Sequence, residues 1–254
     1  MNFPAVCTGC FIPDHIMAGL RADLHIHTFL SPCGDIEMTP RNIIQKAKEQ
    51  QLDLIAITDH NSTLQAPEIR RVGEREGVAV ICGAEITTKE EVHCLTLVET
   101  DAQREELQGY LEKYLPSIPN DPDFFGYQFW VDEEENVLGE VPHLLISAIE
   151  QNIDQVEAFV HSIGGLFIPA HIERPRNSLL SQLGFVPPGM KVDALELSRH
   201  TEVVSFLEKN AYLKKYKFIR SSDAHFLHQV GEVHTVFEME TAGFAGLKKA
   251  LTFL

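Results

Sequence analysis

The sequence predicts an α/β protein in which mainly parallel strands close into a barrel. Short apolar runs alternate with amphipathic stretches along nearly all of the 254 residues, a pattern typical of strands and helices around a parallel sheet. Roughly seven such repeats favour closure of that sheet. Imidazole and carboxylate side chains recur where the apolar runs end, as on the rim of a barrel. The length suits one barrel-sized domain, so residues 1–254 are predicted to form a single domain.

The first half of the chain contains four predicted strands and three predicted helices. The first helix has Thr39 as its N-cap and Pro40 at its first position, and the second ends at Gly77. The predicted strands are 22–27, 52–58, 78–85 and 92–99, and the predicted helices are 39–51, 63–77 and 101–115.

The connection between the third and fourth strands departs from a regular barrel. Only seven residues separate Glu85 from His93, whereas a parallel crossover needs about a dozen or more. We therefore expect an antiparallel hairpin that returns His93 to the neighbourhood of Glu85.

The second half resumes the alternation after an interruption at 116–142. That interruption is rich in proline and contains the aromatic run "FFGYQFW", and it is predicted to be an inserted loop and hairpin arm. The later predicted strands are 166–171, 192–198, 217–225 and 233–239, and the helices are 153–165, 202–213 and 243–254.

The net charge of −16 argues against a broad basic groove, so we expect no binding of duplex nucleic acid. No window approaches about eighteen uninterrupted apolar residues, and the first residues lack the features of a signal peptide. We therefore expect a cytoplasmic protein without membrane contact. The five cysteines do not indicate a disulfide scaffold. Cys7 and Cys10 could be half of a zinc site or a redox pair, but no second CxxC motif accompanies them. The oligomeric state does not follow from the sequence.

The polar residues at strand ends form the strongest functional signal. His25 and His27 share one face of a strand, with Asp23 on the same face as a possible partner of an imidazole. Imidazole and carboxylate together suit Zn, Fe or Mn, and a carboxylate such as Glu85 can bridge two ions. The residues at strand ends are His27, His60, Glu85, His171, Asp223 and His225.

In these motifs the sequence resembles the polymerase and histidinol phosphatase (PHP) superfamily. "DLHIHT" and "ITDHN" match its first two motifs, "GAEIT" with a following "VH" resembles the third, and "IPAH" and "SSDAH" resemble the later ones. The motifs occur in order over about residues 21–235. The resemblance implies a distorted (β/α)7 barrel that holds two to three divalent ions, Zn, Fe or Mn, and hydrolyses phosphoesters.

Carried over by position, the resemblance assigns ligands to each ion. The first ion would be held by His25, His27, Glu85 and Asp223. Glu85 would bridge to a second ion held by His93 and His171. A third would take His60, His225 and a group from the loop after the first motif. For that group we predict Asp35, with Cys33 as the alternative.

The expected reaction is attack of a metal-bridging hydroxide on the phosphorus of a small phosphorylated metabolite or nucleotide. Glu85, Asp223 and His225 are the predicted catalytic residues, and Arg174, Arg176 and Arg199 are the predicted phosphate-binding residues. One alternative is an exonuclease-like phosphodiesterase acting on short single strands. The aromatics of 124–130 could stack a base in that case, although packing in the core or an interface is the competing interpretation. A second alternative is a non-catalytic binding domain stabilised by metal.

Overall fold

The computed structural model describes residues 18–252, and its strands and helices largely follow the predicted order. The strands are β1 (Ala18–Ile26), β2 (Leu54–Ile57), β3 (Ala79–Thr87), β4 (His93–Val98), β5 (Phe129–Val131), β6 (Val137–Glu140), β7 (Leu166–Pro169), β8 (Leu195–Leu197), β9 (Phe218–Arg220) and β10 (Thr235–Met239). The helices are α1 (Pro40–Glu49), α2 (Ala66–Glu76), α3 (Asp101–Tyr114), α4 (Pro122–Phe125), α5 (Ile153–Ser162), α6 (Leu179–Leu183), α7 (Val203–Lys209) and α8 (Phe244–Thr252). Two short 3₁₀ helices, η1 (Ala211–Leu213) and η2 (Leu227–Gln229), complete the set.

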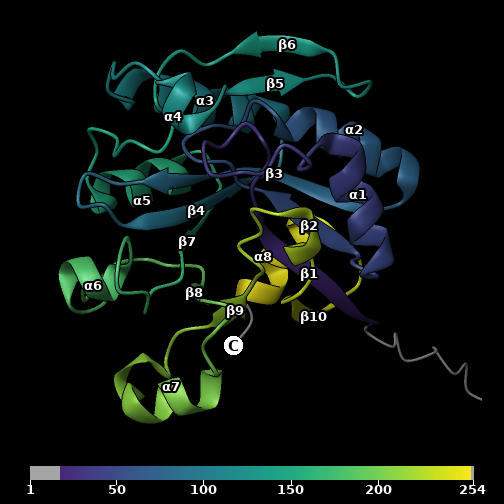
Figure 1. The fold of residues 1–254 in the computed structure, drawn as a ribbon. Coiled ribbons are helices and arrows are strands. Elements are labelled where there is room, and N and C mark those ends of the chain that lie inside the picture. Colours follow the sequence, from purple (N-terminus) through teal and green to yellow (C-terminus); the bar gives the residue numbers. More distant parts are fainter. Residues whose placement is uncertain (1–17, 253–254) are drawn as a thin grey trace, which may run out of the picture.

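A curled six-stranded sheet in the order β10-β1-β2-β3-β4-β7 forms the centre of the molecule (Figure 1). Strands β1, β2 and β3 are parallel, but β4 pairs antiparallel with both β3 and β7, and β10 pairs antiparallel with β1. The expected mainly parallel sheet is therefore a mixed one. The expected hairpin is confirmed, because Thr87 pairs with His93 and Glu85 with Leu95.

The predicted distorted (β/α)7 barrel is confirmed in part: the fold is a curled α/β sheet of the barrel kind, but the expected closure is incomplete. Strands β8 and β9 have three residues each and form a separate parallel pair. Isolated backbone contacts join this pair to the larger sheet: the nitrogen of Ile172 donates to the carbonyl of Glu196 over 2.9 Å, and Ile26 forms a bridge with Ala224. No continuous hydrogen-bonded ladder joins β8 and β9 to the six-stranded sheet, so the barrel is incomplete on this side.

The two faces of β2 explain how the sheet is packed. Ile55 and Ile57 belong to the cluster that includes Ile43 of α1 and Ile69 of α2, whereas Ala56 lies in the cluster on the opposite face. Burial of these side chains contributes about 1.5–3 kcal/mol for each large aliphatic residue, which anchors the strand ends that carry the polar residues.

The 116–142 segment folds as the short helix α4 and the hairpin β5–β6, which crosses the top of the molecule in Figure 1. Gln65, beside the start of α2, fastens the hairpin: its side-chain nitrogen donates to the carbonyl of Val131, and its oxygen accepts from the nitrogen of Val131. Over the described part of the chain, no helix is both long and apolar enough to cross a membrane.

Candidate metal centre

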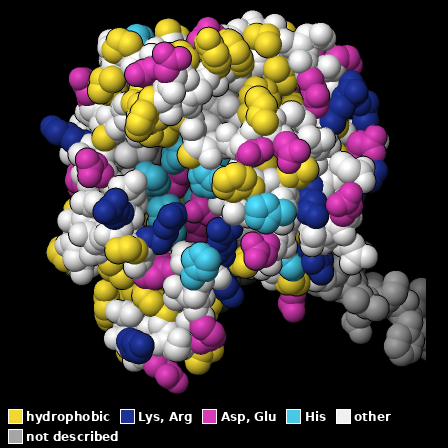
Figure 2. All heavy atoms as spheres, in the orientation of Figure 1, with side chains coloured by type: hydrophobic (Ala, Val, Ile, Leu, Met, Phe, Trp, Pro, Cys, Tyr) yellow, Lys and Arg dark blue, Asp and Glu magenta, His cyan; other side chains and the backbone are white. Residues whose placement is uncertain are grey.

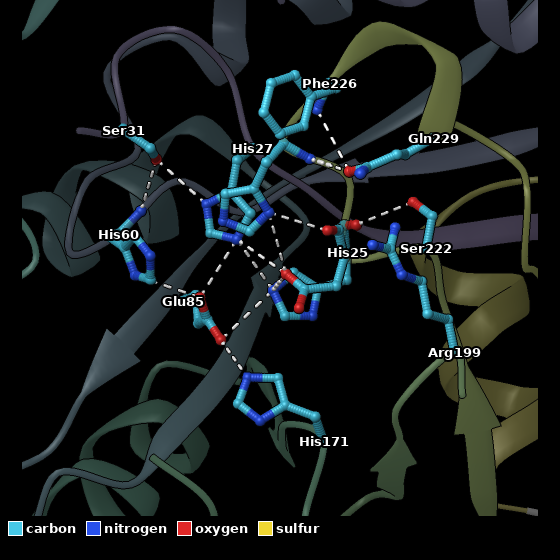
Figure 3. A network of polar contacts seen from close by, with 12 residues as sticks. His25, His27, Ser31, His60, Glu85, His171, Arg199, Ser222, Phe226 and Gln229 are labelled. Carbon is cyan, nitrogen blue, oxygen red and sulfur yellow. Dashed lines mark hydrogen bonds and ion pairs between the residues drawn. The ribbon is translucent and has the colours of Figure 1, made fainter. Parts of the chain in front are cut away.

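Glu85, on β3, lies at the centre of a ring of histidines (Figure 3). Its oxygen Oε1 is 2.9 Å from Nδ1 of His93 and 3.1 Å from Nε2 of His171. The same oxygen is 3.4 Å from Nε2 of His25. Its other oxygen, Oε2, is 3.3 Å from Nε2 of His27 and 3.2 Å from Nδ1 of His60. One buried carboxylate therefore contacts five imidazoles from several different strand ends.

Asp223 supplies the second carboxylate of the cluster. Its oxygen Oδ1 is 3.4 Å from Nε2 of His25 and 3.5 Å from Nε2 of His27. The sequence placed Asp223 and His225 on a strand, but β9 ends at Arg220 and both residues lie in the loop that follows. A φ angle of +50° at Asp223 turns the chain there, and His171 beyond β7 has a φ of +30°. Such strained backbone is a frequent feature of functional sites.

The donor set fits divalent metal ions. Nε2 of His25 faces Nε2 of His27 at 3.1 Å, a pair that needs either a shared proton or a cation. Nδ1 of His171 is buried without a hydrogen-bond partner. Among the residues described, three groups have donor atoms within 4.8 Å of one another. These groups are His25, His27 and Asp223; His60, Glu85 and His93; and His27, Cys33, His60 and His225.

The loop after β1 places Cys33, rather than the predicted Asp35, among these donors. The Asp35 carboxylate accepts a hydrogen bond from the backbone nitrogen of Glu37 over 2.9 Å. Cys33 instead lines the pocket into which Glu85 and its histidines open, the metal pocket. Gly34 allows this path because a Cβ atom there would lie 2.0 Å from the carbonyl oxygen of Thr28. The backbone nitrogen of Asp35 donates to the carbonyl of His225 over 2.8 Å, which holds the loop over the site.

Opposed charges dominate the electrostatics of the cluster. Burial alone would raise the pKa of Glu85, but His93, His25 and His60 hold it well below the usual range. Burial opposes protonation of His27, yet its contacts with Asp223 and Glu85 raise its pKa to about 9. Metal ions would displace protons held in this way, so ion binding should release protons.

His225 differs from its neighbours, because burial and the adjacent His27 lower its pKa to about 4. Its Nδ1 donates to the carbonyl of Asp223 over 2.9 Å. This bond fixes the neutral tautomer and leaves Nε2 free to bind a metal ion.

Two buried carboxylates that sequence reasoning did not assign support the histidines. Glu196, on β8, accepts from Nδ1 of His25 over 3.0 Å and from the backbone nitrogen of His171 over 3.1 Å. Asp59 accepts from the Ser31 hydroxyl over 2.6 Å, and that hydroxyl contacts Nδ1 of His27. The signal available in the sequence was a charged residue within an apolar strand, "ALELS", where burial demands a partner.

Asp23 does not take the role proposed for it from the sequence. Its two oxygens accept backbone nitrogens, from Ser222 over 3.0 Å and from Gly231 over 2.9 Å. Burial raises the pKa of Asp23 to about 6. Asp23 therefore holds the backbone on both sides of the motif "SSDAH" in place, and Glu196 orients the imidazole of His25 instead.

The histidines open into a pocket of about 410 Å³, visible as the hollow with cyan and magenta side chains in Figure 2. Arg174 and Arg176 line it, and Nη1 of Arg174 donates to Oδ2 of Asp223 over 2.7 Å. Arg199 is not among the lining residues, and its nearest acidic partner is Glu232 at 3.7 Å. Cys7 and Cys10 lie outside the described residues.

Two uncharacterized proteins have sequences similar to that of this chain. The chain is 39% identical to uncharacterized protein MJ1587 of Methanocaldococcus jannaschii over 79 residues, covering 28% of this chain and 46% of that protein. It is 26% identical to uncharacterized protein YqxK of Bacillus subtilis over 268 residues, covering 92% and 62% respectively. The chain thus spans less than two thirds of both relatives.

Two solved structures have a similar fold. One is the lesion-specific endonuclease PfuEndoQ from Pyrococcus furiosus, with a TM-score of 0.69 at 20% identity over 92% of this chain and 56% of that one. The other, from Bifidobacterium adolescentis, is described as a candidate metal-dependent phosphoesterase and has a TM-score of 0.61 at 20% identity, covering 91% and 95%.

A further structure corrects the expectation that the substrate is a small molecule and that duplex nucleic acid is not bound. Endonuclease Q, with a TM-score of 0.67, was solved with a 27-mer duplex that has an abasic lesion at the active site. Bound cations can reverse the field locally, so the net charge of −16 does not by itself exclude a nucleic acid substrate.

The family is established by the sequence match. The model of the PHP domain matches residues 23–173, more than half of the chain and all of the ligand motifs up to His171. A second model, described as PHP-associated, matches residues 208–253. The chain belongs to the PHP domain family.

Proposed function

We propose that this chain is a metal-dependent hydrolase of phosphoester bonds in nucleotides or nucleic acid strands. The observation that carries the proposal is the arrangement of Glu85, whose two oxygens contact five imidazoles within 3.4 Å at the base of a pocket that also contains arginines. Bound divalent ions would activate water and neutralise the charge of the phosphoryl oxygens. Relatives with the same fold that act on nucleic acid support the class of substrate.

We assign the residues of the cluster to three metal positions. Glu85 would hold two ions together with its neighbouring imidazoles, one ion with His93 and His171 and the other with His25 and His27. His93, His171 and His25 lie on Oε1 of Glu85, and His27 lies on Oε2. We assign Cys33, in place of Asp35, to a third position with His60 and His225.

Arg174 is the best-placed phosphate ligand. Its guanidinium lines the pocket beside Asp223 and is 47% exposed, so it can donate two parallel hydrogen bonds to phosphoryl oxygens. Arg176 lines the same pocket and would add positive charge.

The test is a metal-dependent assay with purified protein. The apo protein would be loaded with Mn²⁺, Fe²⁺ or Zn²⁺ and offered a phosphomonoester, a nucleoside bisphosphate, a short single strand and a duplex with an abasic site. We expect release of phosphate or cleavage of a strand with at least one of them. Glu85→Ala should lose the two ions that Glu85 would hold, counted by elemental analysis, and the activity, whereas Glu240→Ala, at an exposed residue just after β10, should lose neither ions nor activity. Full metal loading without hydrolysis of any of the four would refute the proposal.

A further inference from the structure

An apolar hollow of about 510 Å³ lies between the hairpin β5–β6 and the loop that follows β1. It is separate from the metal pocket, and Glu135 is the one charged residue among those lining it. Its apolar lining is formed by Phe29, Ile36, Tyr127, Phe129, Val131 and Val137.

Two stacked rings form one wall of this hollow. The rings of Tyr127 and Phe129 are nearly parallel, with centroids 5.0 Å apart and planes 5° apart. Tyr127 is 60% exposed and Ile36 is 78% exposed, so these apolar surfaces face water in the free protein. A gathering of exposed apolar side chains commonly marks a binding surface.

The stack is not the core of the hairpin. Trp130 has that role, because a Cβ atom at Gly139 on the facing strand would lie 2.2 Å from its ring. Tyr127 precedes β5 and is free of this packing, which leaves its ring available to a ligand.

One loop, the segment after β1, contributes lining residues both to the hollow and to the metal pocket. Cys33 lines the pocket, and Ile36, three residues later, lines the hollow, so their Cα atoms lie within about 11 Å of each other. Hydrogen bonds hold this loop in place, from Asp35 to the carbonyl of His225 and from Phe29 to the carbonyl of Met38. In Figure 2, hydrophobic side chains gather above the histidines on the same face of the molecule.

We propose that this hollow binds a base of single-stranded nucleic acid whose neighbouring phosphoester lies in the metal pocket. The inference rests on the proposed function and names the form of its substrate. A base presents an uncharged, flat surface that stacks on an aromatic ring whatever its sequence, and the sparsely charged lining suits a base rather than a phosphate. The base must be unpaired to reach the ring, which selects a single strand or a locally opened one.

The experiment measures binding rather than hydrolysis. Fluorescence anisotropy would follow a labelled single strand of about ten nucleotides with phosphorothioate linkages, which resist cleavage, so that the metal ions can stay bound to the protein. Tyr127→Ala should weaken binding about tenfold, the effect of losing one base stack of ~1.4 kcal/mol, and Tyr127→Trp should restore it. Tyr212→Ala, which removes a 52% exposed tyrosine from η1, is the matched control and should bind as the wild type does. A strand of abasic residues should show no difference between wild type and Tyr127→Ala.

Equal affinity of Tyr127→Ala and Tyr212→Ala for the single strand would overturn the inference. So would a change in self-association of Tyr127→Ala, measured by sedimentation, without a change in affinity for the strand. Tyr127-dependent binding in a protein that hydrolyses no phosphoester would support the base site while rejecting the proposed hydrolase, so the two conclusions can fail separately.

Discussion

Oε2 of Glu196 lies 3.0 Å from Nδ1 of His25, and both side chains are almost fully buried. The same oxygen accepts the backbone nitrogen of His171 over 3.1 Å. Glu196 therefore fixes the tautomer of His25, since Nδ1–H donates to the carboxylate and Nε2 is left for a metal ion. It also ties this imidazole to the loop that carries His171.

Removal of the Glu196 carboxylate should weaken metal binding without removing a ligand. We expect Glu196→Ala to lower metal affinity about 10- to 100-fold, and Glu196→Gln to have a smaller effect because its amide oxygen can still accept from His25. Titration of the apo protein with Zn²⁺ by calorimetry measures both. Glu202→Gln, which alters an exposed helix cap at α7, is the control. An unchanged affinity in Glu196→Ala would show that His25 is oriented without it.

Arg174 and Arg199 should differ sharply in their effect on catalysis. Arg174 donates to Asp223 over 2.7 Å within the pocket, whereas Arg199 lies outside the pocket lining. We expect Arg174→Ala to lower kcat/KM about 10- to 100-fold, the range for a lost hydrogen bond to a charged group, and Arg199→Ala to stay within about twofold. Arg174→Lys should recover only part of the loss because lysine lacks the planar fork. Steady-state kinetics on the best substrate found would check this, and equal losses in both alanine variants would contradict it.

The positions of the donors could be predicted because they depend on local rules. The two-residue period of a strand places His25 and His27 on one face, and the short link between Glu85 and His93 forces a hairpin. Both relationships follow from a few adjacent residues. The structure accordingly brings these side chains together as the spacing implied.

The path of the loop after β1 and the incomplete closure of the barrel depend on contacts between residues that are far apart in the sequence. The path of the loop after β1 is set by Asp59, which accepts the backbone nitrogen of Thr28 and the hydroxyl of Ser31, and by the close approach of Gly34 to Thr28. Neither contact has a signature in the spacing of residues, so the sequence does not show that Cys33, and not Asp35, lies among the donor atoms. The incomplete barrel likewise depends on the lengths of β8 and β9, and propensity does not determine strand ends.

His161 should make the stability of the fold depend on pH. Its ring joins α5 to the segment before β8, with Nε2 3.1 Å from Asp193 and Nδ1 3.3 Å from Glu157. The hydrogen bond to Asp193 outweighs desolvation and raises the pKa of His161. Because the folded-state pKa is the higher one, the stabilisation is complete below the unfolded value of about 6.5 and is lost as pH rises through the folded value.

We therefore expect His161→Gln to lower the free energy of unfolding by about 0.5 kcal/mol below pH ~6.5, and by less as the pH rises. Urea unfolding of both proteins over a pH series, in chelator, measures the difference, and the histidines of the metal centre cancel because both proteins share them. His200→Gln, at an exposed histidine, is the control. A difference that grows with pH would contradict the assignment.

Cys33 should give the third ion a sulfur ligand that Asp35 cannot supply. A thiolate bound to Co²⁺ produces a charge-transfer absorption in the near ultraviolet, which carboxylate and imidazole ligands do not. The measurement is best made in a Cys7→Ser/Cys10→Ser background, so that these two thiols cannot contribute to the absorption. Cys82 and Cys94 need no replacement because they are buried in strands β3 and β4. We expect the Co²⁺-loaded protein to show this absorption, Cys33→Ser to lose it, and Asp35→Asn to keep it. Loss in Asp35→Asn with retention in Cys33→Ser would return the assignment to the carboxylate. The thiolate would also favour Zn²⁺ or Fe²⁺ over Mn²⁺ at this position, so Cys33→Ser should narrow the difference in affinity between Zn²⁺ and Mn²⁺.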